Sequence, residues 1–456
     1  MGVRNTFRAL SSRDYRLFLA GQGISLMGTC FQQTALGWLV YRLTGSSVLL
    51  GLVGFCGQIP SLFLAPMGGV LADRICKRKL IVMTQVLSMG QAAILGTLLV
   101  TGTIRMWHIP VLSFLLGIVN ALDVPVRQSF IVETVRDRTL IGNALSLNSF
   151  MVNMARIIAP PLAGFMIASF GEGVCFYINA ASFGAVILTV CLMGDIRLRI
   201  RTNDAPVFRS LKEGFTYVLG EHEIRSVLVQ LGIVSFCGVP FVVLLPVFAR
   251  DILHGDAGTL GFLMGTSGAG ALSGALFLAS RKNDSDLERI RALGVVLFGL
   301  GLVGFSMSGF FPLSLAMLYL AGFGMIVQMA AGNTLIQNLV DDDKRGRVMS
   351  LFTMAVMGMI PMGSLFQGFM ANQVGASATL AAGGIGCLLC AVVARMMRMR
   401  KAYFEVVFFS FLNKFSASGG PAGGKDRKVK NKDQLWKTGK HITDGAPSAR
   451  RNAELR

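Results

Sequence analysis

The sequence predicts an all-α membrane protein whose twelve transmembrane helices form two pseudo-symmetric six-helix bundles. The first observation is composition, because the 456 residues are 53% hydrophobic and 15% charged, whereas soluble domains carry about 25% charged residues. The second is a series of twelve long apolar runs, and the third is the alternation of basic residues between the segments that join them. A chain with this pattern needs an apolar solvent.

The twelve runs are each long enough to cross a hydrocarbon core about 30 Å thick as an α-helix. Short segments that are polar, charged or rich in Gly separate them, so each run forms an element of its own. In chain order, we expect the spans at residues 17–41, 47–72, 80–102, 107–126, 140–169, 174–194, 226–249, 257–280, 292–309, 311–338, 348–372 and 376–397.

Basic residues support this count independently. If the chain crosses the membrane at every run, 39 of its 43 Lys and Arg residues lie on the side of both termini, and only Arg42, Arg105 and Arg250 lie on the other side. Cytoplasmic loops of membrane proteins carry such an excess. The sequence therefore predicts a multi-pass protein of the bacterial inner (cytoplasmic) membrane with both termini in the cytoplasm. Anionic lipid headgroups, rather than nucleic acid, account for the net charge of +19.

The longest inside segment divides the chain into two halves. We expect an N-terminal six-helix half over residues 1–194, a cytoplasmic linker over 195–225 and a C-terminal six-helix half over 226–400. Residues 401–456 are basic and rich in Gly and Lys, which predicts a disordered cytoplasmic tail.

An internal repeat relates the two halves. Gly164 and Gly171 recur as Gly368 and Gly375, each 204 residues later, so the fifth run corresponds to the eleventh. Parallel halves of six spans are typical of one large class of transporters.

The segment between the second and third runs carries Gly69, Asp73, Arg74, Lys77 and Arg78. With the twelve runs and the repeat, it resembles the loop signature of the major facilitator superfamily over about residues 10–400, although Cys76 stands where that signature usually has Gly. Residues 35–46, 123–128 and 175–183 resemble the branch that contains the enterobactin exporter and macrolide-efflux-like proteins. The resemblance implies a secondary transporter that works by alternating access.

The resemblance also implies a gating role for the loop signature. Asp73 can cap a neighbouring helix, where the macrodipole favours a negative charge at the N-terminus. Arg74, Lys77 and Arg78 can then form a latch that holds the two halves together on the cytoplasmic side. The alternative is a charge cluster that only orients the second and third spans.

Asp123 and Arg127 lie four residues apart at the end of the fourth run, on one face of a helix. They either join the cytoplasmic charge network or form a plain ion pair at a helix end. The sequence leaves both interpretations open.

Arg156 lies inside the fifth run, about 20 Å along the helix. A charge at such a depth is costly unless it faces water, a partner or a substrate. We interpret Arg156 as a contact to an anion or to the substrate, and a structural bond to a neighbouring carbonyl or Gln is the alternative. Pro160, Pro161 and Gly164 follow it and resemble a weakened form of a motif found in exporters, in which the prolines kink the helix.

Four uncharged side chains are further candidates for substrate contacts. Gln33, Asn148, Asn153 and Asn333 lie in runs 1, 5 and 10, which line the cavity in the superfamily that the chain resembles. Each could instead form a hydrogen bond between helices, which is a common role for such residues in membranes.

The sequence holds no Walker loop, nucleophile–base pair or cluster of metal ligands, so we expect no enzyme, no cofactor and no metal. We expect a monomeric transporter that exports a small amphipathic compound, either drug-like or a siderophore. The alternatives are an uptake symporter of the same fold and a membrane enzyme or scaffold without transport. A coupling proton stays open, because none of the expected spans has Asp or Glu at its centre.

Overall fold

The computed structural model describes residues 8–74, 76–135, 137–194, 207–281, 286–342 and 344–418, and within these ranges it contains helices and no strand. It comprises a bundle that ends at Arg395 and a second unit that starts at Met396. In the second unit, α15 continues as a helix to Ser418. The description below concerns the bundle.

The elements are η1 (Arg8–Ser11), α2 (Arg13–Thr44), α3 (Ser47–Arg74), α4 (Lys77–Val100), α5 (His108–Thr134), η2 (Arg138–Leu140), α6 (Ile141–Phe170), α7 (Glu172–Cys191), α8 (Val207–Gly220), α9 (His222–Cys237), η3 (Val239–Leu244), α10 (Leu245–Val247), η4 (Phe248–Ile252), α11 (Ala257–Ala279), α12 (Leu287–Ser306), α13 (Phe311–Leu339), α14 (Arg345–Val374) and α15 (Ala376–Ser418).

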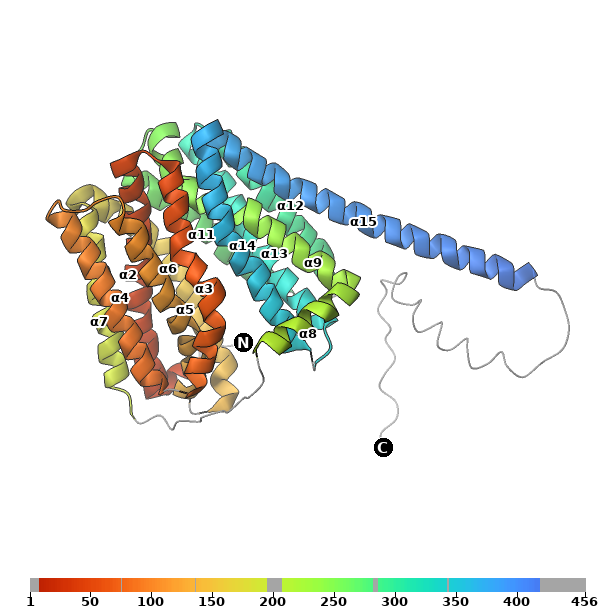
Figure 1. Cartoon of the computed structure of the whole chain (residues 1–456), viewed down its shortest axis with the longest axis horizontal. Coiled ribbons are helices and arrows are strands. Elements are labelled where there is room, and N and C mark those ends of the chain that lie inside the picture. Colours follow the sequence, from red (N-terminus) through yellow and green to blue (C-terminus); the bar gives the residue numbers. More distant parts are fainter. Residues whose placement is uncertain are drawn as a thin grey trace. The chain divides into compact units, whose positions relative to one another are not determined.

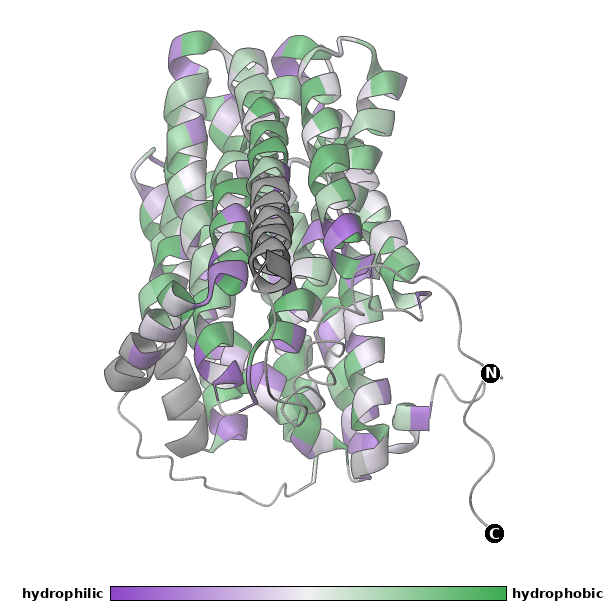
Figure 2. Ribbon diagram, turned by 90° about the vertical axis from the view of Figure 1, so that its right-hand side faces the viewer, coloured by the Kyte–Doolittle hydropathy of each residue, from purple (hydrophilic) through white to green (hydrophobic). Residues whose placement is uncertain are grey.

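The twelve expected spans correspond to α2–α7, the segment from α9 to η4, and α11–α15. Among the described residues, eleven of these spans are long and apolar enough to cross a membrane. The remaining one, α2, is 32 residues long and contains three glutamines that lower its hydropathy, yet it packs within the bundle against α6 and α7. Hydrophobic residues cover the length of the helices, and hydrophilic residues gather toward their ends (Figure 2).

The helices form two groups, which Figure 1 shows in red to yellow and in green to blue. In the first group α2 packs on α6 and α7, and α5 packs on α3 and α4. In the second group α13 packs on α11 and α12, and α14 packs on α9. The groups meet along two helix pairs, α6 with α11 and α3 with α14.

The bundle has two ends that differ in their connections. We call the end with the segments after α3, α5, α7, α11 and α13 the linker end, because it includes the linker and α8. The opposite end, with the segments after α2, α4, α6, η4, α12 and α14, is the distal end. The distal ends of the two groups lie together at the top of Figure 1.

The seventh span is interrupted, although the sequence predicts one continuous run. The helix stops at Cys237 and is followed by 3-10, short α and π turns up to Ile252. Pro240 and Pro246 lie within this stretch and cannot donate the hydrogen bonds that a regular helix requires. The π turn of η4 consequently places Arg250 and Asp251 at the distal end.

The structure reproduces the internal repeat. Helices α6 and α14 both have 30 residues. Each ends at a glycine with positive φ, +81° at Gly171 and +88° at Gly375, a conformation that side chains with a Cβ rarely adopt. The glycines singled out from the sequence therefore terminate two equivalent helices, each of which contacts the other group.

Helix α8 belongs to the linker and is attached to the second group. The carboxylate of Glu213 pairs with Arg347 at 2.9 Å, and the hydroxyl of Tyr217 donates to Asp341 at 3.2 Å. Phe215 and Leu219 remain 57% and 50% exposed. An apolar face next to charged residues is typical of a helix that lies in the membrane interface.

Candidate functional site

One face of α6 changes from exposed to buried halfway along the helix. At helical spacing, this stripe comprises Ser149, Asn153, Arg156, Pro160, Gly164 and Ile167. Toward the linker end, Ser149 and Arg156 are exposed and Asn153 is half-buried. The last three residues of the stripe, toward the distal end, are buried. A single face with two environments indicates that its neighbour lies close only at the distal end.

That neighbour is α11, which approaches the distal part of the stripe backbone to backbone. A Cβ atom at Gly261 would lie 2.3 Å from the carbonyl oxygen of Pro160, and one at Gly164 would lie 2.4 Å from that of Ala257. Only glycine permits helices to approach so closely, as is common between helices in membranes. Gly164 from the predicted motif is thus a contact between the two groups.

Helix α14 shows the same change on its contact face with α3. Its stripe comprises Ser350, Met354, Met357, Pro361, Ser364, Gly368 and Ala371, of which the first three are exposed and the last four buried. A Cβ atom at Gly368 would lie 2.6 Å from the carbonyl oxygen of Ser47, and one at Gly51 would lie 2.6 Å from that of Ser364.

Both contacts between the groups are therefore tight at the distal end, and the same stripes are exposed or half-buried toward the linker end. From these exposed faces, residues 149–156 of α6 and 350–357 of α14, we infer a passage between the two groups. The close helix contacts close its distal end, so we infer that it opens at the linker end. A protein with two groups in this arrangement can change access by moving one group relative to the other.

Arg156 lies where the groups separate. A Cβ atom at Gly268 of α11 would lie 2.8 Å from the carbonyl oxygen of Arg156, so α11 still approaches α6 closely at this turn. The Arg156 side chain is exposed, and no residue of the described part forms a hydrogen bond or ion pair with it. Its charge acts on the thiol of Cys30 on α2. Arg156 therefore lies beside Gly268 of α11, next to the exposed part of the stripe.

The other predicted contacts differ in position. Asn153 is one turn from Arg156 and donates to the Ser149 carbonyl at 2.8 Å. Gln33 is exposed on α2, one turn from Cys30. Asn148 is half-buried beside the stripe, and Asn333 accepts a hydrogen bond from Gln337 at 2.7 Å.

The structure thus places Asn153 near Arg156 and Gln33 near Cys30. It shows no contact that joins Asn148 or Asn333 to Arg156 in the described part of the chain.

Two residues of the loop signature pair within the first group. Lys77 forms an ion pair with Glu133 of α5, and Arg78 donates to the Cys191 carbonyl of α7 at 2.7 Å. Gly69, Asp73 and Arg74 lie in the last turns of α3, and the surroundings of their side chains are outside the described part.

Asp123 lies deeper in its helix than the sequence suggests, because α5 continues to Thr134. Its carboxylate is almost completely buried, with 1% of the residue exposed, and pairs with Arg127. It also accepts hydrogen bonds from Thr84 at 2.6 Å and Gln85 at 3.0 Å. The expected i,i+4 pair is therefore part of a polar cluster between α4 and α5.

A polar contact between the two groups closes the distal end. The Tyr41 hydroxyl of α2 donates to the carboxylate of Asp251 in η4. Arg250 donates to the Tyr41 carbonyl at 3.3 Å, and its guanidinium lies 5.9 Å from the centre of the Tyr41 ring. We call Tyr41, Arg250 and Asp251 the distal latch.

The sequence interpretation missed this latch, although it contained a signal. Arg42 and Arg250 are two of the three basic residues expected on the side opposite the termini. In the structure Arg250 belongs to the distal latch, and Arg42 pairs with Glu172 at 2.6 Å.

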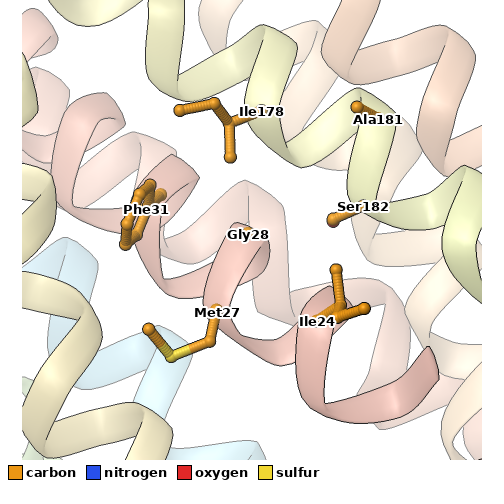
Figure 3. Close-up of a pocket in the computed structure, with 7 residues that line it drawn as sticks. All are labelled: Ile24, Met27, Gly28, Phe31, Ile178, Ala181 and Ser182. Atoms are coloured by element: carbon orange, nitrogen blue, oxygen red, sulfur yellow. The ribbon is translucent and has the colours of Figure 1, made fainter. Parts of the chain in front are cut away.

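A separate hollow of about 440 Å³ lies between α2 and α7. Figure 3 shows its lining, which consists of Ile24, Met27, Gly28, Phe31, Ile178, Ala181 and Ser182. Its side chains are apolar except for one hydroxyl. It offers no group that could anchor a charged compound.

Comparison with known proteins places the chain in a family. The family model described as "Transmembrane secretion effector" matches residues 4–408. The staphyloferrin A transporter of Staphylococcus aureus is 27% identical over 381 residues, covering 83% of this chain and 94% of the relative. Macrolide efflux protein A of Streptococcus pyogenes is 22% identical over 392 residues, with coverages of 83% and 94%. The multidrug efflux pump Tap of Mycolicibacterium fortuitum is 24% identical over 388 residues, with coverages of 82% and 91%.

Solved structures share the fold. The nucleoside transporter NupG superposes with a TM-score of 0.67 at 12% identity, covering 84% of this chain and 99% of NupG. A bacterial homologue of the lysosomal transporter Spinster, in an inward-facing and occupied conformation, gives a TM-score of 0.66 at 13% identity, with coverages of 84% and 96%. The matched residues include nearly all of the helical bundle. This chain belongs to the transmembrane secretion effector family of the major facilitator superfamily.

Proposed function

We propose that this protein is a secondary transporter that exports a small amphipathic compound from the cytoplasm by alternating access. The observation that carries the proposal is the change along α6 from an exposed to a buried face, because it supports a passage that is open at one end only. The family and the relatives named as efflux proteins and as a siderophore transporter support export of a small compound. The substrate contacts in this proposal are Arg156, Asn153 and Gln33, with Asn148 and Asn333 as additional candidates.

The passage lies between two groups of one chain, which supports a monomer as the transporting unit. We propose that the linker end faces the cytoplasm, as the distribution of basic residues indicates. For a coupling proton, we propose Asp123, since its carboxylate is buried between α4 and α5 and a titratable group inside the membrane is the usual requirement.

The orientation has a direct test. Reporter fusions after Arg201 and after Arg400 should both report a cytoplasmic location, because both follow an even number of spans. A periplasmic signal at either position would contradict the proposed topology.

The direction of transport can be measured without knowing the substrate. Untargeted mass spectrometry of cells that produce the protein should find a compound that accumulates in the medium and declines in the cytosol. Asp73→Asn should reduce this export strongly at equal protein level, because the substitution removes the charge of the loop signature. The variant should still bind the compound, since Asp73 lies at the linker end of α3 and away from Arg156.

Each other result has a distinct meaning. A compound that instead accumulates in the cytosol would support the uptake symporter. Normal export by the Asp73→Asn variant would reduce the loop signature to a cluster that only orients the second and third spans.

A further inference from the structure

We propose that the exported compound is an amphipathic anion. Its anionic oxygen group binds Arg156 at the closed end of the passage, and its apolar part lies against the methionines of α14. This inference rests on the proposed function and specifies its substrate class.

The first argument is the charge of Arg156. The side chain is exposed on the stripe and has no hydrogen-bond or ion-pair partner among the described residues. An unpaired charge within the membrane is costly, and an anion that enters the passage can pair with it. Two carboxylates of the chain are engaged elsewhere. Asp123 is buried and already paired with Arg127, and the Asp251 carboxylate accepts a hydrogen bond in the distal latch.

The second argument is the position of Arg156 along α6. Exposed or half-buried residues occupy the stripe between Arg156 and the linker end, whereas residues beyond it contact α11. A compound that enters from the linker end therefore reaches the guanidinium last. The planar guanidinium can bind two oxygens of a carboxylate, phosphate or sulfonate at once, which an ammonium group cannot do in the same geometry.

The third argument concerns the exposed face of α14. Met354 and Met357 of α14 are 41% and 58% exposed on the stripe that turns toward α3 at the distal end. Methionine is flexible and polarisable and adapts to apolar partners of different shape. An exposed charge on α6 and exposed, adaptable apolar side chains on α14 suit an amphipathic anion, and the same charge repels cations.

Cys30 provides a probe for this charge, because it lies within the field of Arg156. The experiment uses full-length protein in inside-out vesicles, with the other seven cysteines replaced by Ala and the bulk export activity checked first. Cys30 is reacted with the anionic sulfonatoethyl and the cationic trimethylammonioethyl methanethiosulfonates. The ratio of the two rates, divided by the same ratio for free cysteine, cancels the reactivity of the thiol itself.

We expect the anionic reagent to be favoured by about fivefold or more, since a charge interaction of about 1 kcal/mol corresponds to about fivefold in rate. Arg156→Lys should keep this preference and Arg156→Gln should abolish it. Lys79→Gln is the matched control, since it removes an exposed charge at the linker end and should leave the ratio unchanged. A ratio equal to that of free cysteine in the protein with Arg156 would overturn the anion proposal, even if the Gln variant does not fold.

A second measurement tests the substrate class. Octanoate should slow the reaction of Cys30 with neutral N-ethylmaleimide, whereas octyltrimethylammonium at equal concentration should not, and Arg156→Lys should weaken the protection. Equal protection by both compounds would contradict the proposal while leaving the passage intact. If N-ethylmaleimide does not reach Cys30 from the linker end at all, both the passage and the proposed function are wrong.

Discussion

Arg156→Ala should lower export by about tenfold or more, because a hydrogen bond to a charged group contributes about 1.5–3 kcal/mol and each 1.4 kcal/mol corresponds to about tenfold in affinity. The loss should appear in the apparent affinity for the compound found by mass spectrometry. The melting temperature in detergent should change little, since the Arg156 side chain has no described partner to lose. Transport kinetics and thermal unfolding of the same preparation provide the measurement.

Two further variants make the result specific. Arg156→Lys should recover only part of the activity, because an ammonium lacks the planar fork that binds two oxygens. Arg105→Ala removes an exposed charge from the distal end and should have no effect. An Arg156→Ala protein with unchanged affinity and a lower melting temperature would show that Arg156 is a packing residue.

Gly261→Leu should reduce export by a similar or larger factor, through the distal contact between the groups. A Cβ atom at Gly261 would lie 2.3 Å from the Pro160 carbonyl oxygen, and neither backbone can yield without separating α6 from α11. Overpacking of this kind costs about 1–3 kcal/mol. Because alternating access already includes a state with the distal end apart, the protein should shift to that state rather than unfold.

Gly90→Leu is the matched control. Gly90 lies in α4, and a Cβ atom there would have nothing within 4 Å. This variant should transport at the level of the unsubstituted protein. Equal export by the Gly261→Leu and Gly90→Leu proteins would mean that the close contact of α6 with α11 is not required for the cycle.

The sequence predicts the long helices well because their signal is local. Each apolar run must cover the hydrocarbon core, so its approximate limits can be counted along the chain. The repeat also carries a local signal, since Gly171 and Gly375 end their helices with positive φ. The interruption of the seventh span was missed because Pro240 and Pro246 lie in a run that remains apolar throughout.

The candidate site is harder to predict, because the role of a polar side chain depends on the face of the helix that carries it. Gln32 and Gln33 are adjacent, yet Gln32 is buried and bonds to Gln91 and Asn179, whereas Gln33 is exposed. The sequence alone cannot distinguish these two residues, because their exposure depends on which face of α2 turns toward its neighbours.

The distal latch shows a second limit. Tyr41 and Asp251 are 210 residues apart in the chain, and no periodicity connects them. Arg156 could be identified from sequence because a charge within a span is rare, but its place at the closed end of the passage follows only from the contact of α6 with α11.

The most direct test of alternating access is a pair of distance measurements between spin labels on the two groups. One pair joins Thr139 and Asp342 at the linker end, and the other joins Thr103 and Met307 at the distal end. In Gly261→Leu, relative to the unsubstituted protein, we expect the linker-end distance to shorten and the distal distance to lengthen. If the two distances instead change in the same direction, or neither changes while export is lost, the two groups do not exchange access as proposed.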